Sequence, residues 1–433
     1  MKSKVSIFWF RRDLRLEDNV GLYHALSSGF PVVPIFIFDE NILAKFEDKK
    51  DRRVDYISQV LYKINTQLKS HETRLNVFYG NPIEIFNMLY KKHFIQAVFC
   101  NRDYEPLAIQ RDIDIYEFFK RKGISFRAFK DQVIFDKSDV LKNNGDSYTV
   151  YTPYSKKWKE ILSREDLKSY DPDYNKFFRQ KFAEIPSLND FGFEKTDIIF
   201  EVPKLATKTI NEYDRFRDYP AMECTTHLGI ALRFGTISIR KCVAFALCHN
   251  QVWLNELIWR EFFMQILYHF PKVVNQSFKS KYDNIKWRNN EREFKKWCEG
   301  ITGFPIVDAG MRQLNQTGYM HNRVRMIAAS FLCKDLLIDW RWGEAYFAQK
   351  LNDFDLSSNN GNWQWVSGSG CDAAPYFRML NPSLQMQKYD KNLEYVRKWL
   401  PELDTENYPN PIIDHAIAKK RALKIYREAL EQK

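Results

Sequence analysis

The apolar run "VSIFWF", residues 5–10, determines the fold expected for the first third of the chain. Arg11 and Arg12 follow it directly, so the run predicts a buried strand and not a signal peptide. Comparable runs recur at residues 32–38, 74–80, 97–101 and 125–129, with amphipathic segments between them. Buried strands that alternate with helices predict a doubly wound, Rossmann-like parallel sheet. No G-x-G-x-x-G or Walker loop accompanies the strands, so the sheet carries no sign of a phosphate cradle.

Helical patterns replace the strand signals beyond about residue 200. "VWLNELIWREFFMQILYHF" and "NRVRMIAASFLCKDLLIDW" are long helical patterns of this kind. Between the two regions the sequence is polar, punctuated by Pro and Gly, and shows no clear period. We therefore expect an α/β domain over residues 1–135, an interdomain connector over 136–200 and an all-α domain over 201–433.

Length and composition limit the classes of protein to which the chain can belong. The 433 residues are enough for two domains. The chain carries 66 Lys and Arg against 55 Asp and Glu, a formal charge of +11, which suits a polyanionic partner but also simple solubility. Its seven cysteines form no C-x-x-C, which argues against a disulfide framework and against a metal site. No run is long enough to span a bilayer, so we expect a cytoplasmic protein with no membrane partner.

The stretch "WLNELIWREFF", residues 253–263, is the first to suggest chemistry. On a helix, Glu256, Trp259 and Arg260 fall on adjoining faces. A carboxylate beside an indole and a guanidinium can line a concave polar site. The same residues also fit an ordinary i, i+4 surface pair between Glu256 and Arg260, with a packed tryptophan.

Two further clusters favour a bound anion. "HNRVRM", residues 321–326, places Asn322, Arg323 and Arg325 near an expected helix start, where the helix dipole attracts negative charge. "CTTHLG", residues 224–229, offers hydroxyls and backbone N–H groups to a phosphate. Ordinary helix caps and solvated arginines explain the same residues.

The stretch "DFDLSSNNGNWQW", residues 353–365, completes the pattern with two acids, three asparagines and two tryptophans. With this stretch included, the chain closely resembles the photolyase and cryptochrome flavoprotein family. The other motifs that carry the resemblance are "FWFRRDLRLEDN", "YDRFRDYP", "ELIWREFF", "GYMHNRVRM", "DWR" and the continuation "VSGSGCDAAPYFRMLNP". The resemblance extends from Ile7 to about Pro401. Within the family, the chain looks most like the class I DNA photolyases, which repair cyclobutane pyrimidine dimers.

The resemblance implies an α/β domain followed by an all-helical domain that binds FAD in a U shape. Arg325 and Asp353 would form a pair beside the isoalloxazine, and Asn359 would face flavin N5. An amide can hydrogen-bond N5 without readily giving up a proton, which would favour the reduced flavin. By motif position, the residues that contact FAD would be Tyr213, Thr225, Thr226, His227, Leu228, Gly229, Arg325, Asp353, Asp355 and Asn359.

The resemblance also gives the tryptophans separate roles. Trp363 matches the flavin-proximal member of an electron-transfer chain that continues through Trp340 to Trp287. An indole suits this role because its large, readily oxidised ring can hold a transient radical. Trp365 matches instead the indole that stacks on damaged bases. Apart from the resemblance, core packing would be the expectation for any one of these rings.

The activity that the resemblance implies is that of a deoxyribodipyrimidine photo-lyase, a carbon–carbon lyase driven by light. The dimer is flipped out of the duplex, receives an electron from excited reduced flavin, splits at C5–C5 and C6–C6, and returns the electron. Glu256 would hydrogen-bond the dimer and stabilise its radical anion. The other implied contacts with damaged DNA are Trp259, Arg260, Asn322, Arg323, Met326, Trp365 and Gln385.

Several alternatives stay open at this point. A cryptochrome-like blue-light photoreceptor would use the same flavin and tryptophans. A (6-4) photolyase would carry a characteristic histidine pair at the lesion, whereas "GYMHNRVRM" resembles the dimer-repair pattern. Leu107 and Ala108 stand where folate-binding relatives have an Asn-Glu pair, so a second chromophore would be a deazaflavin or a second flavin, if any is bound. A monomer is expected for an enzyme that scans DNA.

Overall fold

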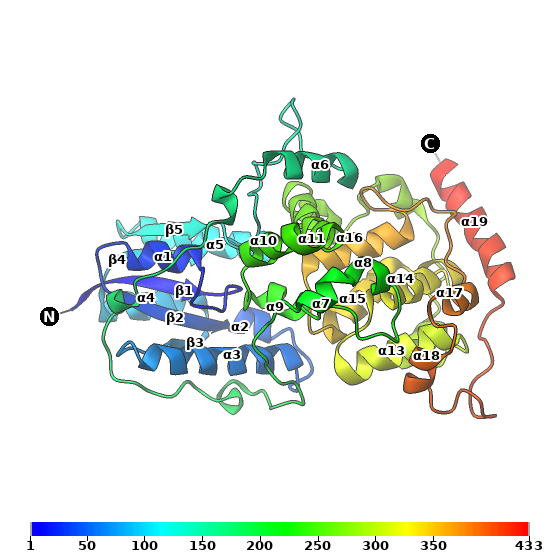
Figure 1. Cartoon of the computed structure of the whole chain (residues 1–433), viewed down its shortest axis with the longest axis horizontal. Helices are drawn as coiled ribbons and strands as arrows, with labels where there is room; N and C mark the ends of the chain where they lie inside the picture. The colour runs from blue at the N-terminus through cyan, green and yellow to red at the C-terminus, as the bar shows by residue number, and fades with distance from the viewer. Residues whose placement is uncertain (1, 432–433) are drawn as a thin grey trace. The chain divides into compact units, whose positions relative to one another are not determined.

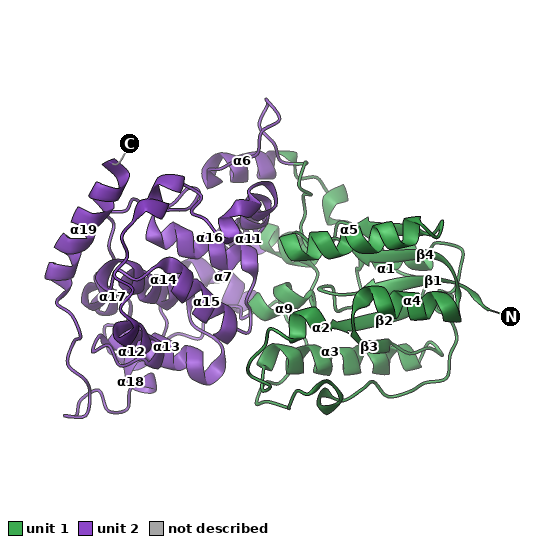
Figure 2. Ribbon diagram, turned by 180° about the vertical axis from the view of Figure 1, so that it is seen from behind, with its two compact units in different colours: residues 1–139, 161–205, 228–248 green, residues 140–160, 206–227, 249–433 purple. Residues whose placement is uncertain are grey.

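The computed structural model describes residues 2–431, which form two compact units (Figures 1 and 2). Unit 1 contains residues 1–139, 161–205 and 228–248, and unit 2 contains residues 140–160, 206–227 and 249–433. The units therefore interleave along the chain instead of meeting at the boundaries expected at residues 135 and 200. An α/β unit and an all-helical unit are nonetheless both present, as the sequence predicted.

Unit 1 is built on a five-stranded sheet whose order is β3-β2-β1-β4-β5. Every pairing is parallel, and the chain winds outward from β1 in both directions, which confirms the doubly wound sheet. The strands are β1 Lys4–Phe10, β2 Val32–Asp39, β3 Asn76–Gly80, β4 Phe94–Asn101 and β5 Ser125–Phe129.

Helices cover both faces of this sheet, which explains the unbroken apolar run in β1. Phe8 and Phe10 pack on one face, against α1 and α3, and Ile7 and Trp9 pack on the other, against α4 and α5. The helices of unit 1 are α1 Val20–Leu26, α2 Glu40–Leu43, α3 Arg52–Lys69, α4 Pro82–Lys92, α5 Pro106–Lys120, α9 Gly229–Phe234 and most of α10 Ile239–His249.

Within the described residues, the named elements of unit 2 are all helices, and an isolated β-bridge joins Leu141 to Ser147. The central contact of unit 2 joins α11 and α16, where Gly361 lets the two helices approach: a Cβ at this position would lie 2.2 Å from the Phe263 ring. The helices are α6 Tyr151–Ile161, α7 Thr207–Asn211, α8 Tyr213–Phe216, α11 Gln251–His269, α12 Glu291–Glu299, α13 Pro305–Thr317, α14 Asn322–Ser330, α15 Trp340–Lys350, α16 Leu356–Ser367, α17 Pro382–Tyr389, α18 Glu394–Trp399 and α19 His415–Glu431.

Helix α6 lies within the segment that was expected to be an irregular connector. Pro153 is tolerated because it sits in the first turn, where a backbone N–H has no partner within the helix. Tyr154 and Trp158, one turn apart, are buried, and Trp158 Nε1 donates to Glu261 Oε1 of α11 at 2.6 Å. The expectation of an irregular connector is wrong for these residues, because two apolar side chains are enough to fix a helix when a distant partner is available.

The C-terminal basic stretch, residues 415–431, forms α19. Ala418, Ala422, Tyr426 and Ala429 face inward at helical spacing. Across residues 2–431, no helix combines the length and the apolar character that a membrane crossing requires.

Candidate functional site

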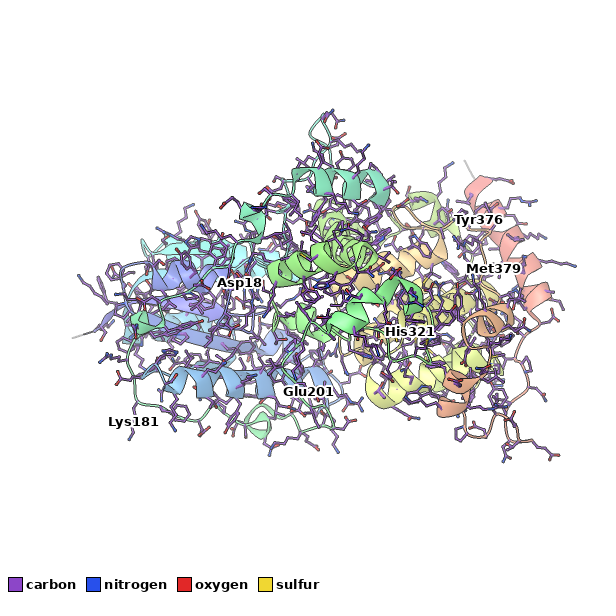
Figure 3. All side chains as sticks on the ribbon, in the orientation of Figure 1. Asp18, Lys181, Glu201, His321, Tyr376 and Met379 are labelled. Atoms are coloured by element: carbon purple, nitrogen blue, oxygen red, sulfur yellow. The ribbon has the colours of Figure 1, made fainter. Side chains whose placement is uncertain are left out.

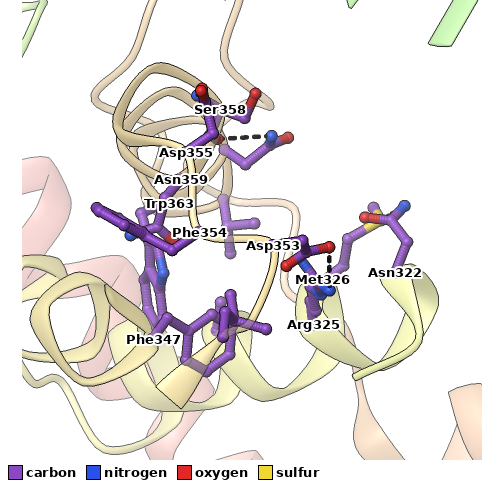
Figure 4. A pocket seen from close by; sticks show the side chains of 14 residues that line it. Asn322, Arg325, Met326, Phe347, Asp353, Phe354, Asp355, Ser358, Asn359 and Trp363 are labelled. Carbon is purple, nitrogen blue, oxygen red and sulfur yellow. Dashed lines mark hydrogen bonds and ion pairs between the residues drawn. The ribbon is translucent and has the colours of Figure 1, made fainter. Parts of the chain in front are cut away.

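A cavity in unit 2 collects residues from two groups that the sequence predicted separately (Figure 4). It lies among α14, α16 and the loop before α16, and has a volume of about 90 Å³. Asn322 and Met326, predicted on the DNA side, line it together with residues predicted on the flavin side. The latter are Arg325, Asp353, Asp355, Asn359 and Trp363.

Arg325 and Asp353 form the predicted ion pair, with Arg325 Nη2 donating to Asp353 Oδ2 at 3.0 Å. Arg325 Nε also donates to the Met320 carbonyl at 2.7 Å, which fixes the guanidinium. Asp353 Oδ1 is buried and has no hydrogen-bond partner among residues 2–431. A buried acceptor at a cavity wall suits a bound molecule that brings its own N–H or O–H group, as the flavin ring does.

Asn359 and Glu344 form a second polar pair behind the cavity wall. Asn359 Nδ2 donates to Glu344 Oε1 at 2.8 Å and to the Glu344 carbonyl at 3.1 Å. Burial raises the pKa of Glu344, and the hydrogen bond from Asn359 opposes that rise. Both hydrogen bonds use the amide nitrogen, so the amide oxygen is the atom that Asn359 can offer to a molecule in the cavity.

Asp355 starts the helix that carries Asn359. It is the N-cap of α16: Asp355 Oδ1 accepts from Ser358 N at 3.1 Å and from the Ser357 hydroxyl. An Asp in this position satisfies backbone donors that have no partner within the helix. The carboxylate predicted at the flavin edge therefore also sets the start, and hence the register, of α16.

The residues predicted to hold the FAD phosphates occupy α8 and the segment before α9. Tyr213 begins α8, and burial, then the charge of Glu256, raise its pKa. Thr225 Oγ1 lies 3.3 Å from Tyr319 Oη, and Thr226 beside it is half-buried. His227 has a left-handed backbone, φ 50°, and its ring centroid lies 4.6 Å from that of Tyr319. Leu228 and Gly229 lead into α9 and belong to unit 1.

The three tryptophans of the predicted electron-transfer chain belong to one aromatic region of unit 2. Trp363 and Trp340 are buried in a single hydrophobic cluster, and the half-buried Trp287 packs against it. Trp363 also contacts a buried indole that the sequence did not single out, Trp297, with ring centroids 6.2 Å apart. Trp287 meets the Tyr426 ring edge-on at 5.9 Å. The geometry thus places an indole other than the predicted Trp340 in ring contact with Trp363.

Glu256 is paired with Arg217, which was not among the predicted site residues. Its Oε1 accepts from Arg217 Nη1 at 2.5 Å, and the Arg217 guanidinium lies 5.3 Å from the Tyr213 ring centroid. Arg217 lies in the "YDRFRDYP" motif, so its place in that motif was the available signal. The structure pairs Glu256 with Arg217, a partner outside its own helix.

The remaining residues predicted to contact DNA are spread over α11, α14, α16 and α17. Arg323 donates to Asp218 Oδ1 at 2.7 Å, and its guanidinium lies 4.4 Å from the Tyr389 ring centroid. Asn322 Nδ2 lies 3.9 Å from Met326 Sδ, one turn along α14. Half-buried side chains at the other predicted positions are Trp259, Arg260, Trp365 and Gln385.

A helical unit with an aromatic, polar-lined cavity, in one chain with a doubly wound sheet, is the architecture of a two-domain flavoprotein. Residues 6–173 match the model of the DNA photolyase family, and residues 253–406 match that of the FAD binding domain of DNA photolyase. The chain belongs to the DNA photolyase family.

Similar proteins cover almost the whole chain. A deoxyribodipyrimidine photo-lyase from Synechococcus is 34% identical and matches 98% of this chain and 96% of its own length. A bacterial class III photolyase from Agrobacterium tumefaciens has a TM-score of 0.89 and 32% identity over 99% of this chain and 98% of its own. An archaeal photolyase from Sulfolobus tokodaii, solved with two FAD molecules, has a TM-score of 0.84 and 33% identity over 98% of this chain and 99% of its own.

Proposed function

We propose that this protein uses light to split cyclobutane pyrimidine dimers in DNA, with FAD as its cofactor. The observation that carries the proposal is the shared cavity: Asn322 and Met326 line it together with Asp353 and Asn359. Electron transfer between a cofactor and a lesion requires that the two lie close together. A single cavity lined by both sets of residues would hold them close to each other. The photo-lyase relatives support the same reaction.

The residues proposed to hold FAD fit its chemistry. Arg325 and Asp353 offer a fixed cation and a buried acceptor, and Asn359 offers an amide oxygen. Thr225, Thr226 and the backbone up to Gly229 would hold the phosphates. When bound and reduced, FAD supplies one electron to the lesion on absorbing light and recovers it once the two carbon–carbon bonds have split.

The chain's own residues prepare the lesion. We propose that Glu256, held by Arg217, hydrogen-bonds the flipped dimer, while Trp259 and Trp365 stack against it. The net charge of +11 favours attraction to DNA, which should weaken as salt is added. A cytoplasmic monomer, with the α/β domain carrying any antenna chromophore, is the state we propose for the working enzyme.

The test is an anaerobic repair assay. The purified protein is photoreduced, mixed with an oligonucleotide that contains one thymine dimer, illuminated with near-UV or blue light, and compared with a dark control. We expect light-dependent loss of dimers, abolished by Glu256→Ala and reduced by Trp365→Ala. Glu428→Ala, an exposed carboxylate on α19, is the matched control and should repair normally.

Persistence of dimers in a sample that binds FAD and is photoreduced would contradict the proposal. The same assay with a (6-4) photoproduct would then show whether the lesion was wrong. Inactivity on both lesions would favour the photoreceptor role.

A further inference from the structure

Tyr151 lies flat against Trp259. The two ring centroids are 3.6 Å apart and the ring planes differ by 5°. Trp259 is the indole of α11 that the proposed function places beside the flipped base, whereas Tyr151 is the first residue of α6. The contact therefore joins the proposed DNA site to the segment in which the sequence predicted no structure.

Tyr151 is held from three directions. Its backbone N–H donates to Asp372 Oδ2 at 3.0 Å, and its hydroxyl donates to the Asn255 carbonyl at 2.9 Å. The helix that it begins is anchored one and two turns later by the buried Glu261, which accepts from Trp158 and from Tyr154. A ring fixed at its backbone, at its hydroxyl and through its helix has few alternative positions.

The rings packed around Trp259 limit the positions that its indole can adopt. One face of the indole is covered by Tyr151, and Phe262 meets it edge-on, with centroids 5.6 Å apart. Phe263 adds a third ring at 5.5 Å. An indole packed in this way keeps its rotamer and can accept a base on one face only.

We propose that Tyr151 is a positioning residue for lesion recognition, because it backs Trp259 so that the indole presents a single, fixed face to the flipped base. The inference rests on the proposed function and deepens it. A base on the open face would complete a three-layer stack of base, indole and phenol. Undamaged DNA keeps its bases stacked in the duplex and would gain nothing from this arrangement.

The test compares affinity for a dimer-containing oligonucleotide with affinity for the same oligonucleotide without the dimer. Tyr151→Ala should weaken binding of the dimer by about 2- to 10-fold, the range expected for one aromatic pair, and leave undamaged binding unchanged. Tyr151→Phe, which keeps the ring, should restore the wild-type ratio. Tyr148→Ala is the matched control. It removes a tyrosine from the same segment, but the ring of Tyr148 contacts Tyr154 and not Trp259.

Thermal melting and the absorbance of bound FAD are followed in every variant. If Tyr151→Ala does not fold, Tyr151→Leu preserves apolar volume without a stacking face and should show the same loss of discrimination. Wild-type discrimination in the folded Ala or Leu variant would overturn the proposal, as would a loss in Tyr151→Phe equal to that in Tyr151→Ala. A wild-type protein that does not discriminate dimers at all would instead reject the proposed function.

Discussion

Asn359 donates a hydrogen bond from its amide nitrogen to Glu344 Oε1, at 2.8 Å, so its amide oxygen points away from that carboxyl group. In the proposed site this oxygen would accept a hydrogen bond from N5–H, which reduced flavin has and oxidised flavin lacks. Glu344, which was not among the predicted site residues, would therefore determine which redox state of the cofactor the amide favours. The pair is 15 residues apart in sequence, on α15 and α16.

Glu344→Leu should lower the reduction potential of bound FAD. Without its acceptor the amide can turn and offer its nitrogen, which suits the oxidised ring. One hydrogen bond of about 0.5–1.5 kcal/mol corresponds to about 20–60 mV for one electron. Spectroelectrochemistry of the purified protein measures the shift, and Glu344→Gln, which keeps an acceptor oxygen, should show little of it. An unchanged potential in the Leu variant would contradict this role.

His321 should make stability depend on pH. Burial, then the charge of Arg325, lowers the pKa of His321 to about 4. The unfolded chain binds this proton near pH 6.5, so the stability present above that pH is lost as pH falls towards 4, by at most about 3 kcal/mol. His321, which is labelled in Figure 3, caps α14. Its Nδ1 accepts a hydrogen bond from Arg323 N.

His321→Asn keeps a good helix cap and removes the titration. Urea unfolding at pH 7.5 and pH 5 should therefore show a smaller fall in the free energy of unfolding for this variant than for the wild type. Equal falls in the two proteins would show that other groups control the acid sensitivity.

Gly343→Ala should disturb Trp363. A Cβ on Gly343 would lie 2.1 Å from the Trp363 ring and 2.5 Å from Leu332, so the indole would have to move. Overpacking of this kind costs about 1–3 kcal/mol. We expect a lower melting temperature together with slower photoreduction of FAD.

Gly310→Ala is the control for that prediction, because its Cβ would lie 2.3 Å from Val324, in a contact without a tryptophan. It should be destabilised to a similar degree and yet be photoreduced at the wild-type rate when folded. Equal slowing in both variants would mean that stability, and not the position of Trp363, governs the rate.

The route of electrons to FAD can be tested at Trp340, which shares a hydrophobic cluster with Trp363, and at Trp297, whose ring contacts that of Trp363. Trp340→Phe should strongly slow photoreduction if the predicted chain carries the electrons. Trp297→Phe should have little effect, even though Trp297 is the indole in ring contact with Trp363. The opposite result, measured from flavin bleaching under blue light with a reductant, would assign the first step to Trp297.

The fold was largely predictable because the sequence pattern that marks each strand or long helix lies within that element itself. All five strands coincide with apolar runs, and α11 and α14 follow the helical patterns quoted for them. The exception is α6, whose anchor, Glu261, lies about one hundred residues further along the chain. The photolyase family and its FAD chemistry were also predicted correctly, whereas placement in class I stays a prediction.

The residues missed in the site share one property: their partners come from other elements. Arg217 meets Glu256 from the residue directly after α8, Glu344 meets Asn359 from α15, and Tyr151 meets Trp259 from α6. Periodicity and motif spacing describe one segment at a time, so they cannot pair residues whose proximity depends on tertiary packing.

The chain passes between its two units five times, at the boundaries near residues 139, 160, 205, 227 and 248. A single recombination point placed anywhere in the chain would leave at least one unit with pieces from two parents. Exchange of an intact α/β unit between relatives would need several simultaneous junctions. Evolution of the α/β unit is therefore expected to proceed by substitution within the existing unit, and engineered chimeras that keep both units intact should change parent at all five boundaries.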